Sequence, residues 1–424
     1  MNLKFRITIL SFLQFFIWGA WLITIANYWF GTKQWGPAEF GKVFSTLGLS
    51  SMIMPALTGI IADKWINAER LYGILHILGA LCLAYVPQVT DPDTFYWVIF
   101  ATMLCYMPTI SLSNSIGYTI LKNNGFDVIK VFPPIRVWGT IGFIVAMWIT
   151  NLTGNKASGN QFYIAAAASL LLGLYAFTMP KCPPPKLISA NSSFVEKLGL
   201  NAFKLFANTK TALFFIFSMF LGAALQLTNM YGDVFLSDFA NVPAYADSFV
   251  VKYSTIIMSI SQISETLFIL AIPFFLKRYG IKNVMLISMF AWVLRFGLFA
   301  YGNPTDGLWM IIMSCVVYGM AFDFFNISGS LFVETTTSPA IRSSAQGLFM
   351  MMTNGIGAFL GATISGFAIE KYFTLAGGQK DWHNIWLSFA VYALVIAILF
   401  WIFFRHKHDP HAITNVHPEP LVNE

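Results

Sequence analysis

The chain has 424 residues, of which 57% are hydrophobic and only 10% are charged. An ordinary soluble domain carries about 25% charged residues, so this composition excludes a soluble globular protein and indicates an integral membrane protein. The formal net charge of +6 is small and dispersed along the chain, which argues against nucleic acid as a partner.

The N-terminal segment places Lys4 and Arg6 before an apolar run that extends from residue 7 to residue 30. The apolar part of a signal peptide has only about 7–15 residues, so we expect a retained first membrane helix. A membrane-spanning helix needs about 20 mostly apolar residues. Runs of this kind predict twelve helices, at residues 7–30, 40–62, 71–89, 94–120, 134–152, 160–179, 211–232, 253–276, 282–302, 308–333, 342–370 and 384–404.

One long polar segment divides these helices into six and six. We therefore predict an N-terminal six-helix bundle (residues 1–180), a cytoplasmic linker (181–210), a C-terminal six-helix bundle (211–405) and a disordered cytoplasmic tail (406–424). The second half of the linker, from Ser193, could form a short amphipathic helix. The expected fold class is all-α integral membrane protein, with twelve transmembrane helices in two bundles.

The two halves also repeat short motifs at matching places. Pro-Pro-Ile-Arg (133–136) opens the fifth predicted helix, and Pro-Ala-Ile-Arg (339–342) opens the eleventh. Internal repeats of this kind are typical of transporters whose substrate site lies at the interface of the repeats, near the middle of the membrane.

Basic residues predict the orientation, because cytoplasmic loops carry an excess of Lys and Arg. With the N-terminus in the cytoplasm, seventeen of the 25 Lys and Arg residues fall in inner loops and tails, and six fall in outer loops. We therefore expect both termini to be cytoplasmic.

Two acids lie near the middle of predicted helices, Glu265 in the eighth and Asp323 in the tenth. They are the only acids that we place deep in the membrane. A charge there costs at least about 2.5 kcal/mol, so such residues usually face a cavity and mark a substrate or ion path. Gln262 shares a helix face with Glu265. The alternatives are a permanently protonated Glu265 that joins helices and an Asp323 paired with an arginine.

Amides and aromatic rings lie near these acids in the pattern. Gln226 and Asn229 share one face of the seventh helix, and amides can both donate to and accept from a neutral polar solute. Tyr318 and Phe322 share a face beside Asp323, an arrangement suited to stacking on a flat ring. The alternatives are interhelical hydrogen bonding for the amides and lipid contact for the aromatic residues.

Two arginines also fall in apolar runs. Arg136, Thr140 and Phe143 form a stripe along the fifth helix, although Arg136 is near the cytoplasmic end and could instead reach the lipid headgroups. For Arg295, in the ninth helix, we favour a structural ion pair over a role in the site. We find no pattern for a metal, a cofactor or enzymatic chemistry, and the histidines of the tail are irregularly spaced.

Several long segments resemble the nucleoside:proton symporter family of the major facilitator superfamily, including bacterial nucleoside permeases and their xanthosine-transporting relatives. The resemblance covers nearly the whole chain and is carried by FLQFFIWGAWL (12–22), MPALTGIIADKW (54–65), FPPIRVWGTIGFIVAMW (132–148), FFIFSMFLGA (214–223), SISQISETLFILAIPFFLKRYGIKNVM (259–285), YGMAFDFFNISGSLFVE (318–334) and SAQGLFMMMTNG (344–355). It implies uptake of nucleosides driven by the proton gradient. It also implies a nucleoside-contacting set similar to Arg136, Thr140, Phe143, Gln226, Asn229, Gln262, Glu265, Tyr318, Phe322 and Asp323.

The resulting hypothesis is a monomeric symporter of the bacterial inner membrane that takes up purine and pyrimidine nucleosides with protons by alternating access. Asp323 or Glu265 would carry the proton. The alternatives are a proton-coupled transporter of another polar solute, such as a sugar or drug, and a membrane receptor that binds without transport.

Overall fold

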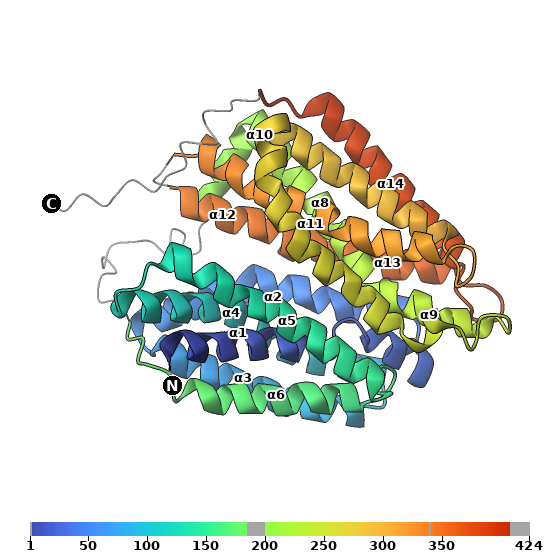
Figure 1. Ribbon diagram of the computed structural model, residues 1–424, viewed down its shortest axis with the longest axis horizontal. Coiled ribbons are helices and arrows are strands. Elements are labelled where there is room, and N and C mark those ends of the chain that lie inside the picture. The colour runs from blue at the N-terminus through green and yellow to red at the C-terminus, as the bar shows by residue number, and fades with distance from the viewer. Residues whose placement is uncertain (1, 185–199, 339–340, 408–424) are drawn as a thin grey trace.

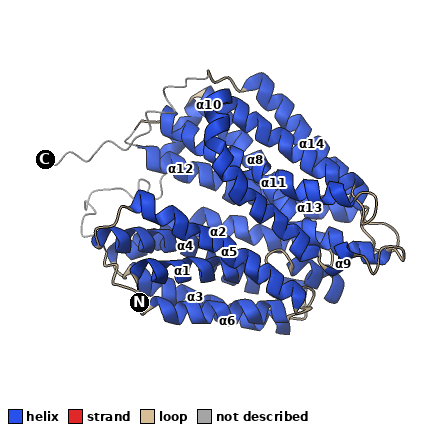
Figure 2. Ribbon diagram, viewed as in Figure 1, coloured by secondary structure: helices blue, strands red, loops and turns tan. Residues whose placement is uncertain are grey.

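The computed structural model describes residues 2–184, 200–338 and 341–407, and helices make up most of this part of the chain (Figure 2). The first half contains α1 (Leu3–Gly19), η1 (Asn27–Thr32), α2 (Pro37–Lys64), α3 (Ala68–Tyr85), η2 (Val86–Gln88), α4 (Pro92–Asn123), α5 (Val128–Leu152) and α6 (Asn160–Ala176). The second half contains η3 (Leu200–Ala207), α8 (Thr209–Asp238), η4 (Phe239–Asn241), α9 (Phe249–Lys252), α10 (Ser254–Tyr301), α11 (Leu308–Thr336), α12 (Arg342–Met350), η6 (Met351–Gly357), α13 (Ala358–Tyr372) and α14 (Trp382–Phe403).

Within the described residues, nine helices are long and apolar enough to cross a membrane, and α6 is a shorter apolar helix. An all-helical chain is expected in a bilayer, because a helix satisfies its backbone hydrogen bonds internally. The predicted fold class, an all-α integral membrane protein, is confirmed.

Several helix boundaries differ from the prediction. The first predicted helix ends early, at Gly19, and the chain continues through turns into the π-helix η1. The predicted helices 253–276 and 282–302, by contrast, are both present: they are the two parts of α10, which a non-helical Gly280 with a φ of 74° separates. Glycine adopts this left-handed conformation without the penalty that a Cβ atom brings. The predicted helix 342–370 is divided into α12, the π-helix η6 and α13.

Two predicted segments fall largely outside the described residues. These are the amphipathic helix from Ser193 and the C-terminal tail. Of the linker, the last part forms the 3₁₀-helix η3.

The two halves of the chain lie one above the other in Figure 1, with α1–α6 below and α8–α14 above. Within the lower half α1 packs against α5, and within the upper half α8 packs against η6. Between the halves, α2 packs against α13 and α5 packs against α10. The described chain begins at the left of the view, where α1 starts, and α9 lies at the right. We call the end with α9 the far end.

Close helix packing within each half depends on glycine. A Cβ atom on Gly142 of α5 would lie 2.2 Å from the carbonyl oxygen of Phe12 in α1, and one on Gly222 of α8 would lie 2.0 Å from that of Thr353 in η6. Small residues at such crossings let helix backbones approach, which is how membrane helices associate without a hydrophobic driving force.

Candidate functional site

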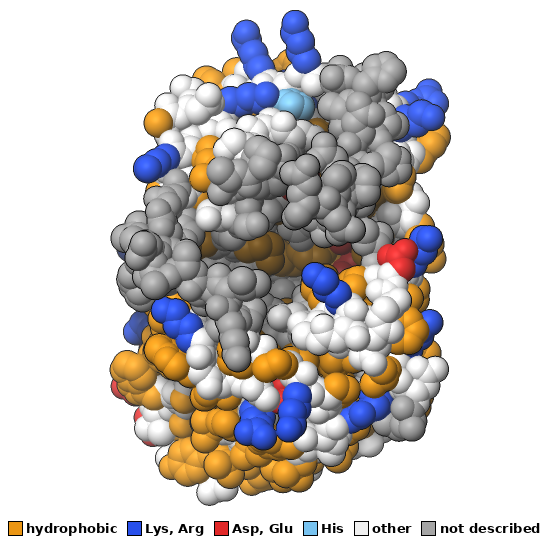
Figure 3. Space-filling view, turned by 90° about the vertical axis from the view of Figure 1, so that its left-hand side faces the viewer, with side chains coloured by type: hydrophobic (Ala, Val, Ile, Leu, Met, Phe, Trp, Pro, Cys, Tyr) orange, Lys and Arg blue, Asp and Glu red, His pale blue; other side chains and the backbone are white. Residues whose placement is uncertain are grey.

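A hollow lies between the two halves. Figure 3 views the molecule from the end that carries the chain termini and shows this hollow, with hydrophobic side chains inside it. The helices that meet across the interface between the halves include α5 and α10, which carry Arg136 and Glu265. The predicted site residues therefore belong to helices at or near this interface.

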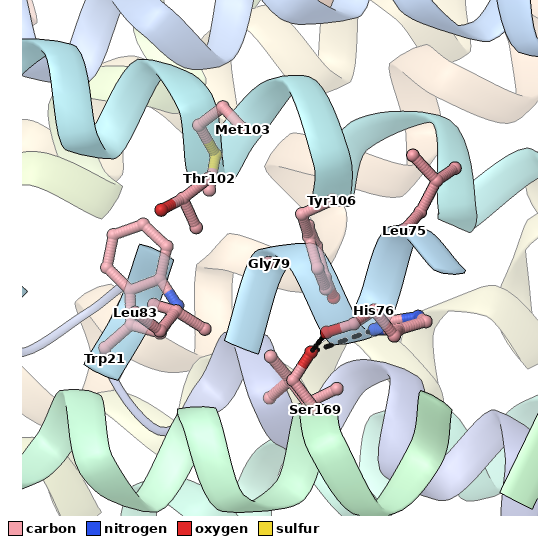
Figure 4. Close-up of a pocket in the computed structure, with 10 residues that line it drawn as sticks. Trp21, Leu75, His76, Gly79, Leu83, Thr102, Met103, Tyr106 and Ser169 are labelled. Carbon is pink, nitrogen blue, oxygen red and sulfur yellow. Dashed lines mark hydrogen bonds between the residues drawn. The ribbon is translucent and has the colours of Figure 1, made fainter. Parts of the chain in front are cut away.

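A separate small cavity lies inside the N-terminal half and is not the substrate site. Its lining includes His76, Tyr106 and Ser169 (Figure 4). His76 is held there on both ring nitrogens, 3.1 Å from Ser169 Oγ and 3.1 Å from Gln14 Oε1. A volume of about 10 Å³ is no larger than the space of one water molecule, so a nucleoside cannot occupy it.

The two predicted acids lie close together on α10 and α11, which pack along their length. Glu265 is half-buried and Asp323 is only 5% exposed. Their charges are near enough to influence each other. Among the described residues, Asp323 Oδ2 has no hydrogen-bond partner, and an unpaired buried oxygen of this kind is costly unless it gains a proton or a ligand.

Arg136 of α5 lies near Glu265, across the interface between the halves. Its guanidinium carbon lies 3.9 Å from the ring centroid of Phe15, and its charge and that of Glu265 influence each other. These contacts are inside the protein, so they do not fit the alternative in which Arg136 reaches the lipid headgroups. Thr140 and Phe143, one and two turns further along α5, are half-buried.

The aromatic pair of α11 is stacked. The rings of Tyr318 and Phe322 have centroids 5.8 Å apart and an interplanar angle of 8°. Tyr318 is 4% exposed, which excludes lipid contact for this ring, and Phe322 is half-buried.

The amides lie on α8 and α10. Gln226 is 6% exposed, while Asn229 and Gln262 are half-buried. The side-chain oxygen of Gln226 has no hydrogen-bond partner among the described residues. The structure therefore does not contain the interhelical hydrogen bond through this oxygen that the alternative interpretation requires.

Asp233 of α8 is a further buried acid, which the prediction did not name as a candidate. Asp233 is 1% exposed, and its Oδ2 accepts a hydrogen bond from Asn27 of the N-terminal half. The predicted helix ends at residue 232, whereas α8 continues to Asp238. Asn229 and Asp233 are four residues apart, and this shared face is the signal that could have identified Asp233.

Two lysines from loops at the far end also connect the halves, and we call Lys156 and Lys380 the far-end lysines. Lys156 follows α5, and its Nζ donates to the carbonyl of Val251 at 2.6 Å and to Ser254 Oγ at 2.9 Å, both in the C-terminal half. In the sequence, both lysines fall in predicted outer loops and carry no other signal. Their burial could not be read from the sequence, because it depends on contacts with the other half.

Lys380 makes the reciprocal contact. It follows α13, its Nζ lies 3.8 Å from the ring centroid of Phe30 in η1, and it forms an ion pair with Asp238 at 3.9 Å. Burial lowers the pKa of both far-end lysines, and the carboxylates of Asp233 and Asp238 oppose the decrease for Lys156 and Lys380, respectively.

Arg295 does not form the ion pair that we predicted. It is fully buried, and its guanidinium donates to Thr228, Ser261 and the carbonyl of Ser314 rather than to a carboxylate of the described residues. The prediction was wrong because hydroxyl, carbonyl and aromatic groups can surround a buried arginine in place of a carboxylate, and sequence spacing cannot reveal these partners. Nη2 of Arg295 has no hydrogen-bond partner among the described residues.

Comparison with known proteins places this arrangement in a family. The family model described as Nucleoside H+ symporter matches residues 1–409. The xanthosine permease of Escherichia coli (strain K12) is 53% identical over 414 residues, which cover 97% of this chain and 98% of the relative. The nucleoside permease NupG of the same organism is 54% identical over 409 residues, covering 96% of this chain and 97% of the relative.

A solved structure agrees with the sequence comparison. The crystal structure of nucleoside transporter NupG superposes with a TM-score of 0.90 at 54% identity, and the match covers 96% of this chain and 100% of that one. The family model matches nearly the whole chain, and both relatives share more than half of their residues with it. The chain therefore belongs to the nucleoside H+ symporter family of membrane transporters.

Proposed function

We propose that this member of the nucleoside H+ symporter family takes up both purine and pyrimidine nucleosides with protons by alternating access. The observation that carries the proposal is the pair of neighbouring acids, Glu265 and Asp323, set opposite Arg136 at the interface of the halves. Acids held in this way are a means of moving protons across a membrane, because ionising them there is costly unless a partner or a solute compensates.

The proposed site combines polar and aromatic side chains from both halves. Gln226, Asn229, Gln262 and Glu265 hydrogen-bond the ribose or the base, and Phe143 and Phe322 pack against the rings. Thr140 and Tyr318 complete the contacts. Asp323 or Glu265 carries the coupling proton, and Arg136 modulates its release. The unpaired oxygens of Gln226 and Asp323 support this assignment, because a bound solute or proton would satisfy them.

We further propose the complete architecture as a monomer with twelve spans in two six-helix bundles, bounded at residues 1–180 and 211–405 and joined by a cytoplasmic linker. The tail from residue 406 is disordered and cytoplasmic. The break at Gly280 divides α10 into two spans, which supports the count. The excess of basic residues on the side of the termini supports cytoplasmic termini in an inner membrane.

With this orientation, the far end faces outward and the described state is open to the cytoplasm. The hollow on the side of the termini (Figure 3) and the contacts of the far-end lysines support an inward-open state. Transport then requires these contacts to break and re-form in each cycle.

The experiment that tests the proposed function is uptake of labelled uridine into proteoliposomes with an imposed pH gradient, in competition with adenosine, xanthosine, free bases and sugars. We expect purine and pyrimidine nucleosides to compete and sugars to have no effect. Competition by a sugar or a drug, without competition by nucleosides, would favour the alternative transporter. Saturable binding without accumulation would favour a receptor.

Replacement of the far-end lysines is expected to open the outer end. In Lys156→Met and Lys380→Met variants, contacts that close this end are lost. We expect a membrane-impermeant maleimide, added outside, to label a Ser259→Cys probe about tenfold faster. This factor corresponds to a loss of about 1.4 kcal/mol in the free energy of closure. Ser259 is 1% exposed and accepts a hydrogen bond from Trp148 of the other half, so it reports separation of the halves.

The matched control for these variants is Lys371→Met, because Lys371 is exposed and contacts aromatic rings of its own helix. Labelling of the probe should be unchanged in this control. Equal labelling rates in all three variants would contradict a role of the far-end lysines in closure.

The same lysines predict a pH dependence of closure. Their pKa is lowered in the closed end, whereas an exposed lysine has a pKa of about 10.4. The closed form therefore binds these protons less tightly, and closure becomes more favourable as pH rises through the interval between the lowered pKa and the ordinary one. We expect labelling of the probe, corrected for maleimide reactivity with the accessible Lys371→Cys variant, to decrease over this alkaline range. An increase would contradict the sign.

A further inference from the structure

Arg295, in the part of α10 beyond Gly280, connects three segments of the C-terminal half. Its side chain is fully buried. Nη1 donates to the carbonyl of Ser314 in α11 at 2.6 Å, and Nε donates to Thr228 Oγ1 in α8 at 3.3 Å. Nη1 also lies 3.4 Å from Ser261 Oγ in the first part of α10. One guanidinium thus joins α8, α11 and the two parts of α10.

Each of these partners is next to a residue of the proposed nucleoside site. Thr228 precedes Asn229, and Ser261 precedes Gln262. Ser314 lies one helical turn before Tyr318. Successive residues of a helix point about 100° apart. A hydrogen bond from Arg295 to Thr228 or Ser261 therefore fixes the rotation of that helix about its axis, while the next residue along the chain can face the site.

Arg295 also holds the ring of Tyr318 directly. The guanidinium carbon lies 4.6 Å from the ring centroid, and Trp292 contacts the same ring edge-on at 5.9 Å and 89°. Ser314 Oγ donates to the Arg295 carbonyl at 2.9 Å, which makes the connection between the helices reciprocal. A cation–π contact is stronger when it is desolvated, so the orientation of Tyr318 depends on this buried arginine.

Among the described residues, the hydrogen bonds of Arg295 go to hydroxyl and carbonyl groups and not to a carboxylate, and a buried charge of this kind is an expensive structural element. Apolar residues of similar volume often replace buried charges without loss of stability, so packing alone does not require an arginine here. We propose that Arg295 is a positioning residue for nucleoside binding: it holds Tyr318, and the segments that carry Asn229 and Gln262, in the geometry that receives the substrate. This inference rests on the proposed function.

The test compares Arg295→Lys and Arg295→Met for the KM and the maximal rate of uridine uptake and for the Kd of uridine in detergent. We expect KM and Kd to increase about tenfold in Arg295→Met, with a smaller change in maximal rate. Arg295→Lys keeps the charge but loses the planar fork, so an intermediate increase is expected. The control is Tyr392→Phe, which removes the hydrogen bond of 2.8 Å from α14 to the Phe220 carbonyl of α8 and should leave KM unchanged.

A double-mutant cycle with Tyr318→Leu separates positioning from general stability. If Arg295 acts through Tyr318, the double variant Arg295→Lys, Tyr318→Leu should bind uridine no more weakly than Tyr318→Leu alone. Because the ring of Tyr318 is the site group that Arg295 contacts directly, the inference requires at least part of its effect to pass through this ring, and fully additive losses would overturn it. So would an unchanged KM in Arg295→Lys while the wild-type protein transports uridine. Absence of uridine binding in the wild-type protein would instead overturn the proposed function itself.

Discussion

Uphill accumulation of uridine is expected to disappear when Asp323→Asn and Glu265→Gln are combined. Both substitutions keep side-chain volume and hydrogen-bonding capacity but remove the group that exchanges a proton. One pH unit corresponds to 1.36 kcal/mol per proton. With one proton per nucleoside, the wild-type protein should therefore accumulate uridine about tenfold, and the double variant should approach a ratio of about 1. The measurement is the steady-state uridine ratio in proteoliposomes at an imposed gradient of one pH unit.

The control for this experiment is Asp233→Asn. Asp233 is also buried, but it bonds to Asn27 across the halves and is not part of the proposed site. We expect this variant to retain the dependence of accumulation on the pH gradient, although its rate can change with the equilibrium of closure. Gradient-driven accumulation that survives in the double variant, or is lost only in Asp233→Asn, would contradict the assignment of the coupling acids.

Closure of the outer end is expected to fail in Gly41→Ala and Gly366→Ala, because these glycines form the contact between α2 and α13. A Cβ atom on Gly41 would lie 2.5 Å from the carbonyl oxygen of Ala362, and one on Gly366 would lie 2.6 Å from that of Pro37. Both obstacles are backbone atoms of the other half. Overpacking costs about 1–3 kcal/mol, which shifts the closing equilibrium by roughly 5-fold to 150-fold.

The expected result is faster outside labelling of the Ser259→Cys probe, together with slower uridine uptake, in a protein that still folds. Two controls bracket this result. Gly59→Ala introduces a Cβ atom with nothing within 4 Å and should be neutral. Gly142→Ala clashes within the N-terminal half and should lower the yield of folded protein instead. Wild-type labelling and uptake in Gly41→Ala and Gly366→Ala would show that closure does not require this contact.

The sequence was sufficient for the fold class and for the helices that carry the proposed site, because long apolar runs with isolated polar residues have few structural explanations. Glu265 and Asp323 were visible for the same reason, since a carboxylate is costly within such a run. That Glu265 lies near both Asp323 and Arg136 is a result of how α10 packs against α11 and α5.

Other features required the three-dimensional contacts. Lys156 and Lys380 are loop residues that become buried only when the halves meet. Arg295 donates hydrogen bonds to groups in three other segments. The π-helix η6 replaces part of a predicted continuous helix where the chain contacts both α8 and α2. Apolar periodicity along one segment carries no information about such partners.

The central physical claim is that a nucleoside and a proton cross together, and the most direct measurement is proton movement driven by uridine alone. Proteoliposomes containing the wild-type protein and a pH-sensitive dye inside should acidify internally when uridine is added outside at equal starting pH. The response should be absent in the Asp323→Asn, Glu265→Gln variant. Uridine entry into wild-type vesicles without any change of internal pH would contradict the account.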